Sequence, residues 1–273
     1  VYRSALTATP NSNGICDVWH QAYLLDGGKR LGPSFYGFRN SVCVPHQVGR
    51  NKNAIDWIDK DGAEEAVFAQ LADIVIRHKR DECIDLPANH IYARGYELSP
   101  AQQKAYDTLQ DTQLLLLTQD RVTARLKGAS PKITAINAAA VATKLIQVAS
   151  GAVYESPEKY RIVDTSRYEM VLDLVEEVDH SLVLYQWKHQ RDLLIEEAKK
   201  RKLTYCVFDG ETSDKKREEL VREYQAGFYQ VMIAHPKTVG HGLTLTRGTR
   251  TIWASPTYDL ELWVQASSRQ HRI

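Results

Sequence analysis

Gln230-Val-Met-Ile-Ala-His-Pro-Lys-Thr-Val-Gly-His-Gly-Leu-Thr-Leu245 decides the fold, because a short apolar run typical of a buried strand leads directly into a Gly-x-Gly loop. Three further β-rich runs occur at 181–187, 203–208 and 250–254. Helical stretches separate the first three of these four runs along the chain. This alternation predicts parallel strands joined by right-handed crossovers, and hence a doubly wound α/β domain with helices on both faces of its sheet.

Parallel strands also predict where a ligand would bind. In open α/β sheets the ligand loops lie at the carboxyl ends of the strands. The loops expected at that edge are Gln186-Trp187, Asp209-Gly210, Lys237 to Gly242 and Ser255 to Asp259.

The last segment, Gln265-Ala-Ser-Ser-Arg269-Gln-His-Arg272, places a glutamine and two arginines four and three residues apart. On a helix this spacing puts the three side chains on one face, with Glu261 one turn earlier. A guanidinium is planar, stays charged and can donate to two phosphate oxygens at once, so two arginines together suit a transferring phosphoryl group. Taken alone, these residues could equally form a solvated helix face paired with Glu261.

Size and composition indicate a globular chain. Its 273 residues are 43% hydrophobic, enough for one large or two ordinary domains. The leucine run Leu114 to Leu117 is far too short to span a membrane, and no secretory signal segment is visible. We therefore expect an intracellular location, cytoplasmic or nuclear, and no membrane partner. The net charge of +1 requires any nucleic-acid binding to use a local basic groove.

The cysteines and histidines predict no metal site. Cys16, Cys43, Cys83 and Cys206 form no Cys-x-x-Cys pair, and the nine histidines form no His-x-x-x-His pair. We expect the thiols to be reduced. Gly28-Lys29 is not a phosphate loop either, because Tyr23 and Arg30 occupy the positions where a Walker A sequence needs Gly and Ser or Thr.

The first hundred residues predict several local elements. Val1 to Leu6 alternates as in a strand, residues 15–27 and 63–80 have helical periodicity, and Ile91 to Leu98 again alternates. Ser99-Pro100-Ala-Gln102 supplies an N-cap, a first-turn proline and a capping-box glutamine. A helix should therefore begin there, and a second helix should follow Pro131.

The motifs together resemble a known family. Ser4-Ala-Leu-Thr-Ala-Thr-Pro10 resembles motif III of helicase-like ATPases, and the basic run at 76–87 resembles the linker between the two motor lobes. Residues 181–187 are similar to motif IV, 236–245 to motif V and 265–272 to motif VI. In this order and spacing they resemble the C-terminal motor portion of a Swi/Snf-type, superfamily-two, DNA-dependent ATPase.

The resemblance implies a four-part division of the chain. Residues 1–31 would be the tail of a first RecA-like lobe, 32–98 a linker with a helical segment, 99–160 a helical insertion and 161–273 a second RecA-like lobe. The chain would then be a piece of a longer protein, an expectation that its lack of an initiating methionine also favours.

The resemblance also implies site residues. Arg269 and Arg272 would be arginine fingers for ATP, with Gln265, Gly240 and Gly242 beside the nucleotide. The residues implied in nucleic-acid binding are Lys237, Thr238 and Thr7. ATP and Mg²⁺ would be bound mainly by the first lobe, and the implied partners are that N-terminal lobe and double-stranded DNA.

Two departures from the family limit these implications. Ser268 replaces the usual motif VI glycine, and Ser255-Pro-Thr-Tyr-Asp-Leu-Glu261 replaces a Trp-Asn-Pro-like stretch. The sequence contains neither a Walker A motif nor an Asp-Glu-x-His motif, so we expect that this chain alone does not hydrolyse ATP. Two alternative hypotheses stay open. The chain could be an RNA or DNA helicase lobe of another superfamily-two branch, or a non-catalytic α/β module that recognises phosphate.

Overall fold

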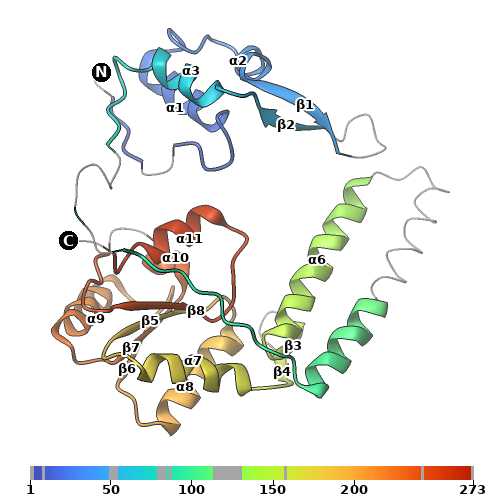
Figure 1. Cartoon of the computed structure of the whole chain (residues 1–273), viewed down its shortest axis with the longest axis vertical. Helices are drawn as coiled ribbons and strands as arrows, with labels where there is room; N and C mark the ends of the chain where they lie inside the picture. The colour runs from blue at the N-terminus through green and yellow to red at the C-terminus, as the bar shows by residue number, and fades with distance from the viewer. Residues whose placement is uncertain are drawn as a thin grey trace. The chain divides into compact units, whose positions relative to one another are not determined.

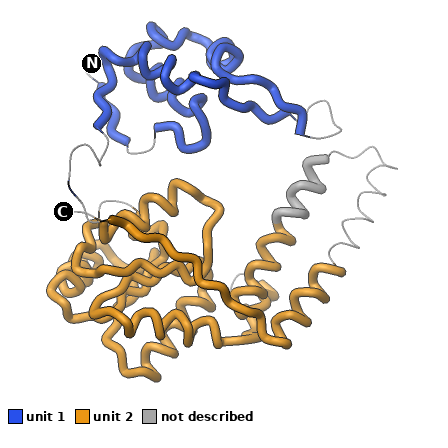
Figure 2. The backbone as a smooth tube through the Cα atoms, viewed as in Figure 1, with its two compact units in different colours: residues 1–85 blue, residues 86–273 orange. Residues whose placement is uncertain are grey.

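The computed structural model describes residues 3–7, 10–48, 55–78, 85, 88–112, 131–156, 159–240 and 243–271, with backbone only for 131–139. The chain forms two compact units, Val1–Asp85 and Leu86–Ile273, coloured separately in Figure 2. No helix among the described residues is long and apolar enough to cross a bilayer. Each unit is described by itself below.

The first unit is a small α+β core. Its elements are α1 (Asp17–Asp26), α2 (Phe35–Val42), β1 (Cys43–Gln47), β2 (Ile55–Asp59) and α3 (Ala63–Gln70). The helix predicted at 15–27 is confirmed as α1, which ends where Gly27 adopts the left-handed conformation with φ 72°. Strands β1 and β2 pair antiparallel, with Cys43 opposite Asp59.

Two local predictions for this unit are wrong. Residues 3–7 have no regular secondary structure, because alternation makes a strand only where a partner strand supplies hydrogen bonds. The helix predicted at 63–80 ends at Gln70. Leu71 is fully buried, and the amides of Ile74 and Val75 both bond to its carbonyl, so the chain turns to bring these apolar side chains onto the core.

The core of the first unit joins residues on both sides of the predicted boundary between 1–31 and 32–98. Ile15 and Val18 pack in the same cluster as Phe38 and Val67. The predicted four-part division of the chain stays a prediction.

The second unit contains the predicted parallel sheet. Its four strands are β5 (Ser181–Leu184), β6 (Tyr205–Phe208), β7 (Val231–Ala234) and β8 (Arg250–Trp253), in the order β6-β7-β5-β8. All three neighbouring pairs are parallel. The α/β fold predicted from the four β-rich runs is therefore confirmed.

Helices cover both faces of this sheet, as Figure 1 shows. Helices α7 (Ser166–Glu176) and α8 (Lys188–Lys200) pack on one face, and α9 (Asp214–Ala226), α10 (Pro236–Val239) and α11 (Leu260–Ser267) pack on the other. Because side chains alternate along a strand, Val183 and Ile233 join the first layer while Leu182 and Met232 join the second. The central strands β5 and β7 are buried on both faces, which is why their sequences are almost continuously apolar.

A helical hairpin precedes the sheet. Residues 100–112 are helical, and α6 (Pro131–Ala149) leads into the antiparallel pair β3 (Ala152–Ser156) and β4 (Lys159–Ile162). The predicted capping box is confirmed, since the Gln102 amide donates to Ser99 Oγ at 3.3 Å and the Ser99 amide donates to Gln102 Oε1 at 3.2 Å. Gln102 also donates to the carbonyls of Val148 and Ala149, which joins the two helices.

The strand predicted at Ile91 to Leu98 is wrong, because residues 88–99 have no regular secondary structure. A side chain anchors this segment in place of a strand ladder. The Tyr96 hydroxyl donates to Asp164 Oδ1 at 2.8 Å and also contacts Ser166 Oγ at 2.7 Å.

A buried histidine connects the hairpin to the sheet domain. His189 in α8 is fully buried, and its two ring nitrogens lie 3.0 Å from the hydroxyls of Tyr154 and Ser150. Burial lowers the pKa of His189 from 6.5 to about 4. The imidazole is therefore neutral in the folded protein at physiological pH.

The pKa of His189 predicts how stability depends on pH. In the unfolded chain His189 takes up a proton near pH 6.5, whereas in the folded chain it does so only near pH 4. The free energy of unfolding therefore has its full value above pH 6.5 and decreases as the pH falls from 6.5 to 4. Between pH 7 and pH 5 we expect a loss of about 2 kcal/mol from this group. Urea unfolding of the wild type and of His189→Gln, which cannot titrate, measures the difference; equal pH dependence in the two proteins would contradict the prediction.

Candidate functional site at the carboxyl edge of the sheet

The loops after the four parallel strands lie at one edge of the sheet. Tyr185 and Gln186 follow β5, Asp209 follows β6, His235 follows β7 and Ser255 follows the last residues of β8. The ring centroids of Tyr185 and His235 are 5.6 Å apart, which places the loops of neighbouring strands in contact. Burial lowers the pKa of His235, so this ring contributes no positive charge at neutral pH.

The short helix α10 positions two predicted nucleic-acid contacts. His235 is its N-cap and accepts from the Lys237 amide at 3.3 Å, while Pro236 fits the first helical position. Lys237 is exposed. Thr238 is partly buried, and its hydroxyl contacts the carbonyls of His235 at 2.6 Å and of Phe208 at 3.1 Å. Thr238 therefore ties this loop to the end of β6, whereas the Lys237 side chain faces solvent.

Arg269 binds the loop that follows β7. Its side chain is only 5% exposed, and its guanidinium donates to the carbonyls of Gly240 and, at 3.4 Å, of Leu243. The carbonyl of Arg269 in turn accepts from the Leu245 amide at 2.9 Å. The segments that resemble motif V and motif VI are thus joined through one arginine.

The prediction that Gln265, Arg269 and Arg272 share one helical face is wrong for Arg269, and Arg272 lies outside the described residues. Helix α11 ends at Ser267, where the Ser268 hydroxyl donates back to the Val264 carbonyl at 2.6 Å. Arg269 lies beyond the helix and turns inward. Glu261 and Gln265, one helical turn apart in α11, do make the expected contact, with Gln265 Nε2 donating to Glu261 Oε1 at 2.7 Å.

Three predicted site residues nevertheless meet. Gly240 is buried, and a Cβ added to it would lie 3.1 Å from the Pro236 carbonyl and 3.5 Å from Gln265 Oε1. A side chain at position 240 would therefore press on the Pro236 carbonyl and would touch Gln265 at ordinary contact distance. Gly240 thus lies directly beside Gln265, and its carbonyl accepts from Arg269.

The remaining predicted residues are Gly242, Arg272 and Thr7. Gly242 and Arg272 lie outside the described residues. Thr7 is exposed and belongs to the first unit.

Gln190 is a positioning residue that the sequence reasoning missed. It is fully buried in α8, and its Oε1 accepts from the amides of Gln186 at 2.7 Å and Trp187 at 3.3 Å. Its Nε2 donates to Ser255 Oγ at 2.5 Å, so one side chain connects the loops after β5 and β8. Its place at the third position of a predicted helix, where capping glutamines occur, is the signal that could have found it.

Arg167 supports the same loop from the start of α7. Its guanidinium donates to the Ala254 carbonyl at 3.1 Å and to Ser255 Oγ at 3.4 Å, and it lies 4.8 Å from the centre of the Tyr96 ring. Burial lowers the pKa of Arg167. On the other side of the edge, Arg191 pairs with Asp209 at 3.2 Å.

The described residues do not fit a metal centre, since no group of three His, Cys, Asp or Glu side chains among them could hold an ion. The Mg²⁺ implied by the family resemblance therefore has no ligand set in the described part of this lobe. The Arg269 guanidinium is likewise not open to a nucleotide phosphate in this conformation, because it is buried and already donates to main-chain carbonyls.

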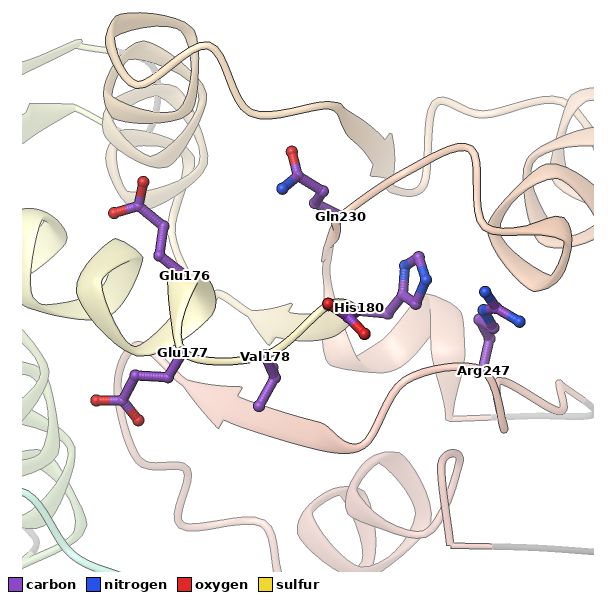
Figure 3. A pocket seen from close by; sticks show the side chains of 7 residues that line it. Glu176, Glu177, Val178, His180, Gln230 and Arg247 are labelled. Carbon is purple, nitrogen blue, oxygen red and sulfur yellow. The ribbon is translucent and has the colours of Figure 1, made fainter.

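A cavity of about 430 Å³ lies at the opposite edge of the sheet. Figure 3 shows its lining, which comes from the loops that precede β5, β7 and β8. The lining residues are Glu176, Glu177, Val178, Asp179, His180, Gln230 and Arg247. This cavity is separate from the predicted site, which lies where the strands end.

Comparison with known proteins agrees with this arrangement. Residues 166–273 match the family model described as Helicase conserved C-terminal domain. This part of the chain is similar to the conserved C-terminal domain of helicases. The match includes the whole parallel sheet and both segments joined by Arg269, and it begins at the first residue of α7.

Similar proteins extend over more of the chain than the helicase-like lobe. Protein p41 of Acyrthosiphon pisum secondary endosymbiont phage 1 is 26% identical over 97% of this chain and 54% of its own length. An uncharacterized ATP-dependent helicase of Mycoplasma genitalium is 23% identical over 98% of this chain and 24% of its own length. The chain thus spans about half or less of these relatives.

One solved structure shares the fold across nearly the whole chain. The SWI2/SNF2 ATPase core domain of Sulfolobus solfataricus has a TM-score of 0.51 and 18% identity, covering 99% of this chain and 54% of that one. At this identity the similarity establishes the fold alone.

The contacts of Arg269 predict a structural cost for its removal. Arg269→Ala leaves two carbonyls of the Gly240 loop without their donor, so we expect the lobe to lose about 2–4 kcal/mol of unfolding free energy. Chemical denaturation measures this loss. Arg247→Ala is the matched control, because Arg247 is exposed and the change should alter stability by less than about 0.5 kcal/mol. Equal effects of the two substitutions would show that Arg269 does not hold the loop.

Proposed function

We propose that this chain is the C-terminal motor portion of an ATP-dependent DNA translocase of the Swi/Snf type, which couples ATP hydrolysis to movement on duplex DNA. The observation that carries this proposal is the contact of Arg269 with the carbonyls of Gly240 and Leu243. This contact links the loop proposed to bind DNA, which follows β7, to the segment proposed to bind ATP, which follows α11, so that the two would move together. The match of residues 166–273 to a helicase C-terminal domain supports it.

The proposed nucleotide contacts are Arg269, Arg272, Gln265, Gly240 and Gly242. In the structure Arg269 is buried and Gln265 bonds to Glu261, so these two residues hold the shape of the site. The two arginines would supply positive charge to a phosphoryl group held by the N-terminal lobe. ATP and Mg²⁺ would be bound mainly by that lobe, whose contribution this chain requires for hydrolysis.

The proposed DNA contacts are Lys237, Thr238 and Thr7. Lys237 is exposed in the first turn of α10, and its ammonium group can reach a phosphate. Contacts of this kind to a phosphate backbone give affinity without reading the sequence of bases. They suit a motor that must move along DNA of any sequence.

A comparison of nucleic acids tests the proposed activity. In the full-length protein we expect ATP hydrolysis to be stimulated more by duplex DNA than by single-stranded DNA or RNA, and Arg272→Ala to reduce it on the order of 10³-fold. The isolated 273-residue chain should show no turnover. Stronger stimulation by RNA or single strands would favour a helicase of another branch. Unchanged hydrolysis in Arg272→Ala would favour a non-catalytic module that recognises phosphate.

A lysine substitution tests the proposed DNA surface separately. Lys237→Ala should weaken duplex binding by about 3- to 10-fold and reduce the slope of log affinity against log salt by about 1. Fluorescence anisotropy over a range of salt concentrations measures both quantities. Lys199→Ala is the control, because Lys199 is exposed in the last turn of α8, away from the loops that follow the strands. An equal loss in the two variants would rule out a DNA contact specific to Lys237.

A further inference from the structure

Two cysteines distant in the sequence meet in the first unit. Cys16 immediately precedes α1, and Cys43 is the first residue of β1, 27 positions later. Their sulfur atoms are 3.3 Å apart, and neither cysteine is in a disulfide. A small movement of either side chain would bring the sulfurs to bonding distance.

Asp59 holds this pair together. It lies opposite Cys43 in the β1–β2 register, and its Oδ1 accepts from the Cys43 thiol at 3.3 Å while its Oδ2 accepts from the Ile15 amide at 2.9 Å. The turn before α1 can approach because Gly14 has φ 130° and no side chain; a Cβ there would lie 3.3 Å from both carboxylate oxygens. One carboxylate thus positions both sulfur-bearing segments.

The two thiols differ in their surroundings. Cys43 is 2% exposed, and burial, the neighbouring Cys16 thiol and Asp59 raise the pKa of Cys43 to about 12. Cys16 is partly exposed. An oxidant from solvent therefore reaches Cys16 first, and Cys43 lies in place to react with the product.

We propose that Cys16 and Cys43 form a reversible thiol-oxidation site that closes to an intramolecular disulfide when it reacts with a low-molecular-weight disulfide. The Cys16 thiolate attacks the small disulfide, forming a mixed disulfide and releasing one thiolate. The Cys43 sulfur then attacks Cys16 Sγ while its proton passes to the departing small thiolate, so that the S–S bond of the mixed disulfide breaks and a second small thiol is released. In total the two cysteines lose two protons and two electrons, and the small disulfide is reduced to two thiols.

The new bond would join α1 to the β1–β2 hairpin. It would close a loop across 27 positions and so restrict the unfolded chain, which raises the unfolding temperature of the first unit. Helix α1 also contacts the end of the Ser4 to Pro10 segment, because Gln21 Nε2 donates to the Pro10 carbonyl at 2.7 Å. The oxidised bond would therefore fix the helix that follows this segment.

Oxidised glutathione is the probe for this site. After treatment of the wild-type chain we expect the mass of a single disulfide, a peptide linking Cys16 to Cys43, and full reversal by dithiothreitol. The unfolding temperature of the first unit should rise by roughly 10 °C. Cys43→Ser should instead retain one glutathione on Cys16, because no second thiol displaces it, and Cys16→Ser should leave Cys43 unmodified.

These readouts require no ATP hydrolysis, so they succeed or fail independently of the proposed motor function. Cys206→Ser is the control, since Cys206 is buried in β6 of the other unit and its loss should leave closure unchanged. A stable glutathione adduct on Cys16 in the wild-type chain, a linkage to Cys206 or no reaction of Cys16 would each overturn the proposal. The wild-type result alone decides it if the serine variants do not fold.

Discussion

The hydrogen bonds of one buried guanidinium hold the candidate site together. Arg269 donates to the carbonyls of Gly240 and Leu243, and its own carbonyl accepts from Leu245. Carbonyls in a loop after a strand have no ladder partner, and an unpaired carbonyl in a buried place is costly. Arg269 supplies the donors, so the shape of the loop depends on a residue about thirty positions later in the chain.

The same principle recurs across the second unit. Gln190 joins the loops after β5 and β8, Arg167 supports the second of these loops, and Gln102 closes the helical hairpin. In each case a side chain from a helix satisfies main-chain groups that lack a partner in regular structure. The ends of the sheet are thus organised by polar side chains, while its centre is packed by apolar residues on both faces.

Sequence reasoning succeeded where one local pattern was sufficient. The four β-rich runs became the parallel sheet, and Ser99 with Gln102 formed the expected capping box. It failed for 3–7 and 88–99, where alternation was present but no neighbouring strand existed among the described residues. The role of Gln190 was missed because its partner Ser255 comes from a loop 65 positions later, which helical periodicity does not connect to α8.

The sequence by itself determined the class of fold and the edge of the sheet where Lys237, Gly240 and Gln265 would be found, because apolar runs separated by helices admit few packing solutions. Only the tertiary structure decided how Arg269 is used. Its spacing from Gln265 fits a helical face, yet the helix ends at Ser267 and the guanidinium turns inward. Spacing is a local property, whereas the direction of a long charged side chain depends on which carbonyls the rest of the fold leaves unpaired.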